Sequence, residues 1–400
     1  MRPPPRFARL VLVTPDGAVV GALPATPVAT PWWQDMAPVI EAVRAAHGVE
    51  VTVLRVLEIA PHPKSVQVTY LAEVAEAVPA EPWDGVLDDH PLRNSYAKLG
   101  GPAKDLAWAA AILAEQGLTP IGPPRQVRTW NLSSLWAIPV AGQTVWLKAT
   151  PPFFAHEAPL IAALAGEAVP TLLGHGDGRF LMAELPGVDL HEAQTDQLFP
   201  MVDLLVGIQA RWIGREADLL ALGLPDWRGP ALTAAIAETF ERTAPELSTK
   251  TRGALTAFIA DLPRRFDDLA ACGLPDTLAH GDFHPGNLRG DGEHLALMDW
   301  GDSGVGHPLL DSSAFLDRVP PEAQDAVRAV WLARWREVVP GSDPARALAL
   351  LAPIAAARQA VIYRGFLDNI EPAEHPYHAG DPVDWLTRTA ALVRAEPRAG

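Results

Sequence analysis

The stretch His280-Gly-Asp-Phe-His-Pro-Gly-Asn287, with Met298-Asp-Trp-Gly301 shortly after it, is the most informative part of this chain of 400 residues. Asn287 follows Asp282 by five residues, and Asp299 follows Asn287 by twelve, after a short turn and an apolar run. In phosphoryl transfer, one carboxylate orients the attacking hydroxyl, while an amide and a second carboxylate hold the magnesium ions that neutralise the phosphates. A turn aspartate that caps the next helix would explain Asp282 alone. The complete order of groups favours phosphoryl transfer.

This stretch resembles the catalytic loop and the metal-binding aspartate of the aminoglycoside phosphotransferase and choline kinase-like family, whose members have a protein-kinase-like fold. The resemblance covers about residues 120 to 370. It implies that Asp282 accepts or orients the proton of a substrate hydroxyl, and that Asn287 and Asp299 bind Mg²⁺. It also implies that ATP is the phosphate donor.

Two histidines in the stretch raise the possibility of a metal site. His280 and His284 are four residues apart, a spacing that brings two ligands together only on a helix. Pro285 and Gly286 prevent a helix from continuing here. The resemblance instead gives both histidines a structural role within the loop, and it makes Asp311 the residue that anchors the loop through backbone hydrogen bonds.

The motif ends at Gly301, and Asp302 and His307 follow it. Gly301 stands where many relatives carry an acidic residue, which removes one charge but none of the required ligands. Asp302 could bind metal or face the substrate, and a surface turn explains it as well. His307 stands where an aspartate is frequent, and we assign it no role.

The segment Val145-Trp-Leu-Lys-Ala149 places one lysine in an alternating apolar strand. By itself this pattern indicates a solvated lysine at a sheet edge. The resemblance makes Lys148 the cation that contacts the α- and β-phosphates, a task that suits a movable point charge, and makes Glu157 its ion-pair partner. Glu167 is the alternative partner, but it follows Ala165-Gly166, where the helix is expected to end.

The segment expected to cover the phosphates, Trp130-Asn-Leu-Ser-Ser134, lacks the glycines of protein kinases. Ser133 and Ser134 can instead donate hydroxyl and backbone N–H groups to the nucleotide. The sequence has no G-x-x-x-x-G-K-[ST] loop, which argues against a P-loop enzyme. The resemblance also places the adenine against backbone groups of Glu184 and Leu185, in a hinge strand.

Recognition of the acceptor is expected in the helical part of the chain. Tyr363, Arg364, Asp368 and Glu371 belong to a polar and aromatic cluster that differs from the Ala- and Leu-rich helices before it. Acidic groups beside aromatic faces suit a polyhydroxylated or aminated ligand. Asp302 is a further candidate, and a solvated C-terminal loop explains the cluster equally well.

The predicted elements indicate an α+β protein with a bilobal, protein-kinase-like fold, made of a β-rich N-lobe, a helical C-lobe and an additional N-terminal α/β module. The boundaries are residues 1–78 for the module, 79–103 for a linker rich in Pro, Gly and Asp, 104–186 for the N-lobe and 187–400 for the C-lobe.

The module is expected to contain a hairpin over 7–23, a helix over 38–47 and strands over 51–59 and 65–74. This order faintly resembles the Nudix fold. The glutamate-rich metal-binding helix of that family is missing, because only Ala, Ala and His follow Arg44. We therefore interpret the module as a degenerate Nudix-like or capping domain and expect no hydrolase activity from it.

Composition limits the partners and the compartment. The formal charge of −16 argues against binding to nucleic acid or to an anionic membrane, and it is compatible with a cationic substrate, although solubility explains most of the charge. The single cysteine, Cys272, excludes an intramolecular disulfide framework. No apolar signal sequence and no run of eighteen uncharged apolar residues occurs, so we expect a cytoplasmic protein. The composition suggests a GC-rich bacterial genome.

We therefore expect an ATP- and Mg²⁺-dependent kinase that transfers the γ-phosphate to a hydroxyl of a small acceptor, such as an aminoglycoside, an amino sugar, choline or homoserine. GTP as donor and the oligomeric state are left open. Two alternatives come from other classes of protein. One is a pseudokinase that acts as a nucleotide-binding regulatory module, and the other is a Nudix-type pyrophosphohydrolase.

Overall fold

The computed structural model describes residues 6–62 and 65–396, which form two compact units. Unit 1 contains the chain up to Ala158 together with Thr171–Glu184 and Asn369–Tyr377. Unit 2 contains Pro159–Pro170, Leu185–Asp368 and the chain from His378 onward. The predicted N-terminal module and most of the predicted N-lobe thus belong to one unit, and a short segment from the predicted C-lobe joins them.

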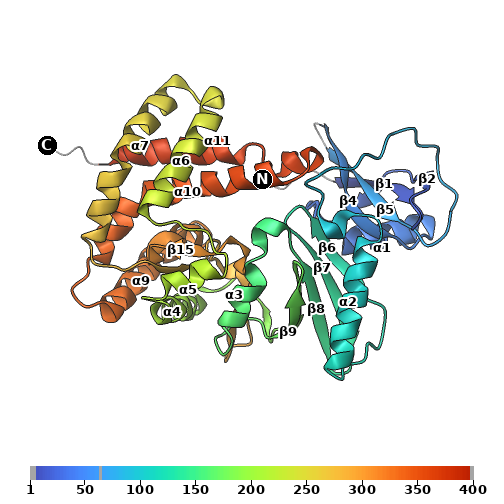
Figure 1. Ribbon diagram of the computed structural model, residues 1–400, viewed down its shortest axis with the longest axis horizontal. Coiled ribbons are helices and arrows are strands. Elements are labelled where there is room, and N and C mark those ends of the chain that lie inside the picture. The colour runs from blue at the N-terminus through green and yellow to red at the C-terminus, as the bar shows by residue number, and fades with distance from the viewer. Residues whose placement is uncertain (1–5, 63–64, 397–400) are drawn as a thin grey trace. The chain divides into compact units, whose positions relative to one another are not determined.

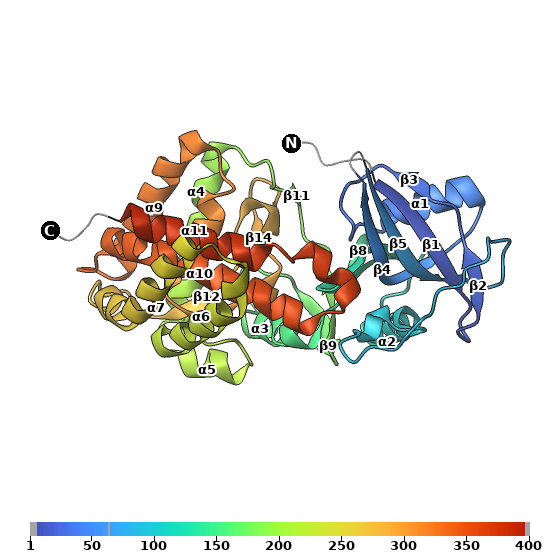
Figure 2. The same cartoon turned by 90° about the horizontal axis from the view of Figure 1, so that it is seen from above.

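The first sheet of unit 1 is built from the N-terminal residues, and Figure 2 shows its long strands beside one another. Its strand order is β2-β1-β5-β4, with β3 also paired to β1, and only β1 and β5 run parallel. The helix α1 buries Val39, Ile40 and Val43 and ends at Gly48, whose φ of 69° is the left-handed conformation that glycine adopts readily. The predicted hairpin, helix and two strands are all present. The strands and helix are β1 Arg6–Val13, β2 Val19–Ala22, β3 Thr26–Val28, α1 Ala37–His47, β4 Thr52–His62 and β5 Ser65–Glu73.

The second sheet of unit 1 is antiparallel, with the order β6-β7-β8-β10-β9. The helix α2 lies along it, and Ala109 and Leu113 pack against its apolar side chains (Figure 1). The Gln126 side chain connects the two sheets, because its amide accepts from Val53 N at 2.9 Å and donates to Val53 O at 2.7 Å. The elements are α2 Gly101–Glu115, β6 Arg125–Trp130, β7 Ser133–Val140, β8 Gln143–Ala149, β9 Leu172–Gly176 and β10 Arg179–Ala183, and α3 Glu157–Ala163 begins in unit 1 and ends in unit 2.

The segment Asn369–Tyr377 returns from the C-terminal part of the chain to unit 1. Glu371 accepts hydrogen bonds from Arg93 at 3.0 and 2.7 Å. The Tyr377 ring contacts those of Trp33 and Trp130, with centroid distances of 4.7 and 5.5 Å. The segment therefore completes unit 1 by packing against residues that lie far away in sequence.

Unit 2 is mainly helical, as predicted, and α6, α7 and α11 pack together in it (Figure 1). Two small sheets, β11-β13-β14 and β12-β15, hold the residues of the 280–303 region. The helices are α4 Thr195–Arg211, α5 Glu216–Ala221, α6 Gly229–Thr243, α7 Thr249–Ala270, α8 Ser312–Leu316, α9 Gln324–Val338, α10 Pro344–Asn369 and α11 Asp381–Ala395. The strands are β11 Val188–Asp189, β12 Thr277–Ala279, β13 Leu288–Gly290, β14 Leu295–Leu297 and β15 Gly304–Gly306.

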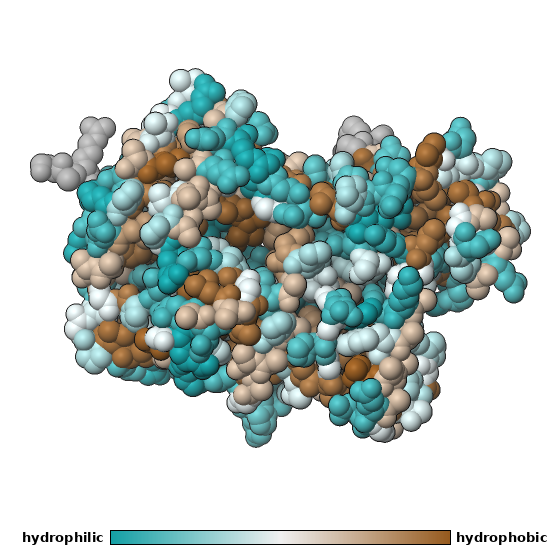
Figure 3. Space-filling view, in the orientation of Figure 1, coloured by the Kyte–Doolittle hydropathy of each residue, from teal (hydrophilic) through white to brown (hydrophobic). Residues whose placement is uncertain are grey.

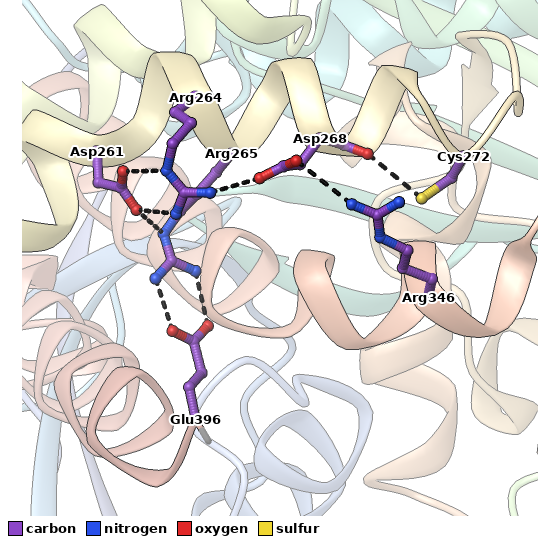
Figure 4. A network of polar contacts seen from close by, with 7 residues as sticks. All are labelled: Asp261, Arg264, Arg265, Asp268, Cys272, Arg346 and Glu396. Atoms are coloured by element: carbon purple, nitrogen blue, oxygen red, sulfur yellow. Dashed lines mark hydrogen bonds and ion pairs between the residues drawn. The ribbon is translucent and has the colours of Figure 1, made fainter. Parts of the chain in front are cut away.

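A polar network fastens the end of α7 to two other helical segments (Figure 4). Arg265 donates to both oxygens of Glu396 at 2.6 Å, and Arg346 donates to Asp268 at 3.3 Å. Cys272 is buried, its thiol donates to the Asp268 carbonyl at 3.4 Å, and burial raises its pKa. The thiol therefore serves in packing just after the end of α7.

One helix in the described part of the chain, α10, is long and apolar enough to cross a membrane. Half of its most apolar window is buried inside the protein, and the core helix of a soluble protein meets the same criterion. The most apolar part of α10 contains Arg346 and Arg358, so it is not one of the uncharged runs of eighteen residues that the sequence analysis considers. On the face drawn in Figure 3, apolar residues are interspersed with hydrophilic ones.

Candidate functional site

Two short strand pairs bring the predicted magnesium ligands together in unit 2. Leu288 of β13 pairs with Leu297 of β14, so Asn287 and Asp299 lie at the same end of this hairpin. The Met298 N–H donates to the Asn287 carbonyl at 2.9 Å and extends the pairing by one residue. The close placement expected from the turn and the apolar run is present.

Asp311 holds the loop of residues 280–287 by its backbone. The Asp311 carboxylate accepts from His280 N at 2.9 Å and from Gly281 N at 2.7 Å. Gln209 of α4 donates to the same carboxylate at 3.0 Å. The group is fully buried, and burial raises its pKa. These backbone contacts are the ones that the resemblance implied.

The Asp282 carboxylate is surrounded by donors. His284 Nε2 lies 3.3 Å from Asp282 Oδ2, and Arg318 Nη2 lies 3.6 Å from Oδ1. Asn287 Nδ2 donates to the Asp282 carbonyl at 2.9 Å and approaches Oδ2 at 3.3 Å. Burial raises the pKa of Asp282, but the hydrogen bond from His284 and the charge of Arg318 outweigh it, and the pKa is lowered. Asp282 is therefore an oriented, ionised carboxylate at neutral pH.

The two histidines of the loop make hydrogen bonds within it. His280 Nδ1 accepts from Asp282 N at 3.3 Å, so its Nε2 carries the proton and donates to the Met298 carbonyl at 3.0 Å. His284 Nδ1 accepts from Gly286 N at 3.0 Å, which leaves its Nε2 to donate to Asp282. Within residues 6–62 and 65–396, no group of three or more His, Cys, Asp or Glu side chains could hold a metal ion. The histidine contacts are those of structural residues.

Two backbone positions near the site adopt the left-handed conformation. Gly281 has a φ of 91°, and a Cβ atom there would lie 1.8 Å from the Asp302 carbonyl oxygen, so glycine is required. Asp299 has a φ of 63°, which is uncommon for a residue other than glycine. Strain of this kind is concentrated at functional sites, where the surrounding structure enforces it.

Arg358 of α10 is a site residue that the sequence interpretation missed. It is 1% exposed and donates to the carbonyls of Gly281 and Asp302 at 3.4 Å. Its guanidinium lies 3.6 Å from the ring centre of Trp227. Burial lowers the pKa of Arg358 to about 10, so it remains charged. The available signal was the position of Arg358 inside the apolar run of α10, where an unpaired charge would be costly.

In unit 1, Lys148 of β8 forms an ion pair with Glu157, the first residue of α3. The Nζ–Oε1 distance is 2.7 Å, and the side chains are 13% and 1% exposed. The Phe180 ring, opposite Lys148 on β10, lies 5.8 Å from Nζ. The alternative partner, Glu167, is bound to Arg211 in unit 2. The structure thus pairs Lys148 with the glutamate that the resemblance implied.

The hairpin of residues 130–134 is braced by side chains instead of being rich in glycine. Ser133 Oγ accepts from the Trp130 indole at 3.2 Å. Ser134 Oγ accepts from the Trp136 indole at 3.2 Å, and Ser134 is 1% exposed. The Ser133 hydroxyl is therefore better placed than that of Ser134 to donate to a ligand.

Two residues of the predicted linker support this hairpin from outside. Tyr96 OH donates to the Trp130 carbonyl at 2.9 Å, and Asn94 Nδ2 donates to the Asn131 carbonyl at 3.2 Å. The Tyr377 ring also contacts that of Trp130, so residues both before and after the hairpin in sequence hold it in place. No sequence signal had linked these residues to it, because all the contacts are long-range.

The comparison of sequences identifies the family. The family model described as "Phosphotransferase enzyme family" (APH) matches residues 141–350, more than half of the chain. The chain belongs to this family. It is a phosphotransferase with a kinase-like fold of mixed α and β structure, as found in aminoglycoside phosphotransferases and choline kinases. No curated protein matches the sequence.

Two solved structures with TM-scores of 0.51 have the same fold at low sequence identity. The choline kinase LicA from Streptococcus pneumoniae is 13% identical, with a TM-score of 0.51 over 74% of this chain and 100% of that one. An ethanolamine kinase from Plasmodium vivax is 10% identical, with a TM-score of 0.51 over 73% of this chain and 88% of that one. The macrolide 2'-phosphotransferase MphH from Brachybacterium faecium is 19% identical, with a TM-score of 0.49 over 73% of this chain and 99% of that one.

The predicted hinge residues of the phosphotransferase fall at a boundary between the units. Glu184 ends the β10 segment of unit 1, and its carboxylate accepts from the Trp146 indole at 2.8 Å. Leu185 is the first residue of the next segment of unit 2. The Glu184 side chain thus has a structural contact of its own, which is consistent with an adenine site made of backbone groups.

The five predicted acceptor residues of the phosphotransferase are divided between the two units. Asp368 is paired with Arg242 at 2.5 Å and with Arg364 at 3.3 Å in unit 2. Glu371 is in unit 1, where it binds Arg93 at 2.7 Å. Tyr363 and Asp302 are both in unit 2. Burial of the phenol is the main cause that raises the pKa of Tyr363, and the negative charge of Asp302 raises it further.

Proposed function

We propose that this phosphotransferase is an ATP- and Mg²⁺-dependent kinase that phosphorylates a hydroxyl group of a small acceptor. The proposal depends on one observation above all. Asp282 is ionised and fixed by His284 and Arg318, while Asn287 and Asp299 lie together at the end of the β13–β14 hairpin. This arrangement provides the orienting carboxylate and the oxygen donors that phosphoryl transfer needs.

Asp282 acts mainly by position in this proposal. The transition state of phosphoryl transfer is loose, so the base needs only to orient the acceptor hydroxyl and take up its proton late. A lowered pKa keeps the carboxylate ready to accept a hydrogen bond at neutral pH. His284 and Arg318 prevent its rotation, and the carboxylate is one-third exposed, so an acceptor can reach it.

Asn287 and Asp299 fit Mg²⁺, which prefers oxygen ligands and keeps several waters. Both amide hydrogens of Asn287 Nδ2 are directed toward Asp282, which leaves Oδ1 as the ligand atom. The left-handed backbone at Asp299 fixes the direction in which its side chain leaves the hairpin. When bound, Mg²⁺ would neutralise phosphate charge.

Lys148 supplies the second cation of the proposal. Glu157 keeps its ammonium group in place at 2.7 Å, and we propose that the ammonium binds the α- and β-phosphates. Ser133 contributes its hydroxyl and N–H groups, and the backbone near Glu184 and Leu185 receives the adenine.

For the acceptor we propose an amino sugar, an aminoglycoside or a small amino alcohol. The Tyr363 ring lies 5.6 Å from those of Phe366 and His378, which gives an aromatic surface in unit 2. The negative charge of the carboxylates Asp282 and Asp302 raises the pKa of Tyr363 further, beyond the effect of burial, so this surface lies in a field that favours a cationic group.

We propose a structural role for residues 6–78, as a degenerate Nudix-like cap without chemistry of its own. The helix α1 has no acidic residue in its first turn and ends with Arg44 and His47, which is the opposite of a metal-binding helix. Gln126 of β6 attaches the second sheet to Val53 of β4 in the cap through two buried hydrogen bonds.

The test is a screen for acceptor-dependent release of ADP over aminoglycosides, amino sugars and amino alcohols. The Asp282→Asn variant is expected to lose about 10³-fold in turnover and to keep its affinity for ATP and Mg²⁺. Asp325→Asn, at an exposed carboxylate, is the matched control. Unchanged turnover in Asp282→Asn would sink the proposal.

A pseudokinase is the second candidate, because the 130–134 hairpin is braced by tryptophans and has no glycine. This alternative predicts nucleotide binding without turnover. Mg²⁺-dependent hydrolysis of ATP that is lost in Asp282→Asn would exclude it.

A further inference from the structure

A cavity of about 220 Å³ lies within unit 2, apart from the Asp282 carboxylate. Most of its lining residues are apolar, and the carboxylates of Asp267 and Asp276 and the His307 imidazole also line it. These residues come from α6, α7, α10 and the segments between them. The main apolar residues are Trp227, Leu232, Phe266, Leu269, Leu351 and Ile354. An engineered apolar cavity of about 150 Å³ is large enough to bind benzene, so this cavity can hold a substituted ring.

One polar side chain in the wall, His307, has an unused donor. His307 Nδ1 accepts from Leu309 N at 3.2 Å and caps the short helix Pro308–Asp311. The proton is therefore on Nε2. His307 is 5% exposed, and within the described part of the chain its Nε2 has no hydrogen-bond partner. Burial lowers the pKa of His307 to about 3, so the imidazole stays neutral.

A buried donor without a partner is unfavourable, and a ligand atom that accepts from it would remove that penalty. An aspartate at this position could make the same cap, because a carboxylate also accepts the Leu309 N–H. It would offer the cavity no donor. His307 thus keeps the cap and adds an N–H donor to a wall whose other side chains are apolar groups and the acceptor carboxylates of Asp267 and Asp276.

The cavity is also connected to the 280–287 loop. The Trp227 ring that lines it carries the Arg358 guanidinium at 3.6 Å, and Arg358 donates to the Gly281 carbonyl. Leu310, another lining residue, directly precedes Asp311, which anchors His280 and Gly281. An occupant would therefore touch Trp227, which contacts the loop through Arg358, and Leu310, which is connected to the loop through Asp311.

We propose that this cavity is a binding site for a compact, largely apolar molecule, about the size of a substituted benzene ring, that presents a carbonyl or ether oxygen to His307 Nε2. Its occupant packs against Trp227 and Leu310, and it thereby stabilises the Arg358 and Asp311 supports of the 280–287 loop. The cavity is an effector site, distinct from the acceptor site of the proposed kinase.

The binding test compares acetophenone with ethylbenzene on the full-length protein. The two molecules have nearly the same shape, and only acetophenone has an acceptor. Titrations followed by saturation-transfer NMR are expected to give a Kd about five to ten times lower for acetophenone, the effect of one hydrogen bond. Failure of both probes to bind folded protein would overturn the site.

Two variants assign the binding to this cavity. His307→Asp keeps the cap but removes the donor, so it should lose the preference for acetophenone while ethylbenzene binds as before. Ala270→Phe places a large side chain at an exposed lining position and should weaken both probes. His294→Asp, at an exposed histidine, is the control and should bind both probes normally. An unchanged preference in a folded His307→Asp, or unchanged binding in Ala270→Phe, would contradict the proposal.

The effect on the loop is measured separately. Saturating acetophenone is expected to change the rate of ATP turnover in the wild type and not in Ala270→Phe. An unchanged rate at saturation would overturn the effector role. This arm depends on the proposed kinase activity, whereas the binding arm does not, so failures of the two proposals are distinguishable.

Discussion

The 280–287 loop in unit 2 and the 130–134 hairpin in unit 1 are held in place by different kinds of interaction. In unit 2, buried charges hold the backbone of the 280–287 loop, through Asp311 on its N–H groups and Arg358 on its carbonyls. In unit 1, the 130–134 hairpin is held by aromatic rings and neutral hydrogen bonds from Tyr96, Asn94 and Tyr377. Removing a buried charge that satisfies several donors is costly, whereas neutral contacts contribute little each. The loop should therefore be intolerant of substitution and the hairpin tolerant.

The largest effect is expected from Asp311→Ala, which leaves the N–H groups of His280 and Gly281 without their acceptor and removes one of the two acceptors of the Gln209 amide. We expect the free energy of unfolding to fall by about 3 kcal/mol or more, with loss of turnover. Denaturant unfolding followed by circular dichroism measures the change. Asp311→Asn keeps one acceptor oxygen, so its free energy of unfolding should lie between those of the wild type and Asp311→Ala. A fully stable, active Asp311→Ala would show that buried charge does not hold this loop.

Glu157→Gln and Lys148→Met test the charged pair in unit 1. We expect kcat/KM for ATP to fall by about 100-fold in Lys148→Met, because a donor to the phosphates is lost. Glu157→Gln should have a smaller effect, since the ammonium remains but is less firmly placed. Initial rates at varied ATP check this, and Lys250→Met, at an exposed lysine, is the control. Equal rates in Lys148→Met and the wild type would mean that Lys148 does not contact the nucleotide.

Tyr377→Leu tests the brace on the hairpin. Loss of the ring contacts with Trp33 and Trp130 should raise KM for ATP about fivefold and leave kcat nearly unchanged. Tyr377→Phe keeps both ring contacts and should behave like the wild type. If Tyr377→Leu lowered turnover as much as Asp311→Ala, the contrast between the hairpin and the loop would not hold.

The smallest effect concerns pH and Glu374, beside the brace. Burial, with a smaller contribution from the charge of Glu371, raises the Glu374 pKa from 4.5 to about 8. Between these values the folded protein keeps a proton that the unfolded chain releases, so rising pH reduces the free energy of unfolding. We expect the melting temperature to fall by a few degrees between about pH 6 and about pH 9, and Glu374→Gln to reduce that fall. An equal fall of the melting temperature in the wild type and in Glu374→Gln would show that Glu374 does not cause this pH dependence.

The sequence predicted the loop better than the hairpin for a physical reason. The residues from His280 to Asp299 act through local spacing, because one loop and one β-hairpin carry them all. Arg358 and Tyr377 act across long distances in sequence, and neither has a local pattern that reveals its partner. The expected kinase-like fold is confirmed by the family match, whereas the roles of the individual site residues remain predictions.

The acceptor region also shows that a local sequence pattern does not reveal contacts between residues far apart in sequence. Tyr363, Asp368 and Glu371 are close in sequence and are predicted as one polar and aromatic cluster. The chain passes from unit 2 to unit 1 between Asp368 and Asn369, and Glu371 binds Arg93 of unit 1 while Asp368 binds Arg242 of unit 2. A composition pattern cannot show such a crossing, because the residues on both sides of it are polar and aromatic alike.

The return of Asn369–Tyr377 to unit 1 also affects how the chain can fold during synthesis. The rest of unit 1 has left the ribosome by Glu184, yet its last segment is made only after nearly two hundred further residues. Until then Arg93 lacks Glu371, and Trp33 lacks Tyr377. Domains often fold as they emerge from the ribosome, in order from the N-terminus. Here the first unit to emerge is completed only when most of the second has been made, so a nascent chain must keep an exposed tryptophan from aggregating in the interval.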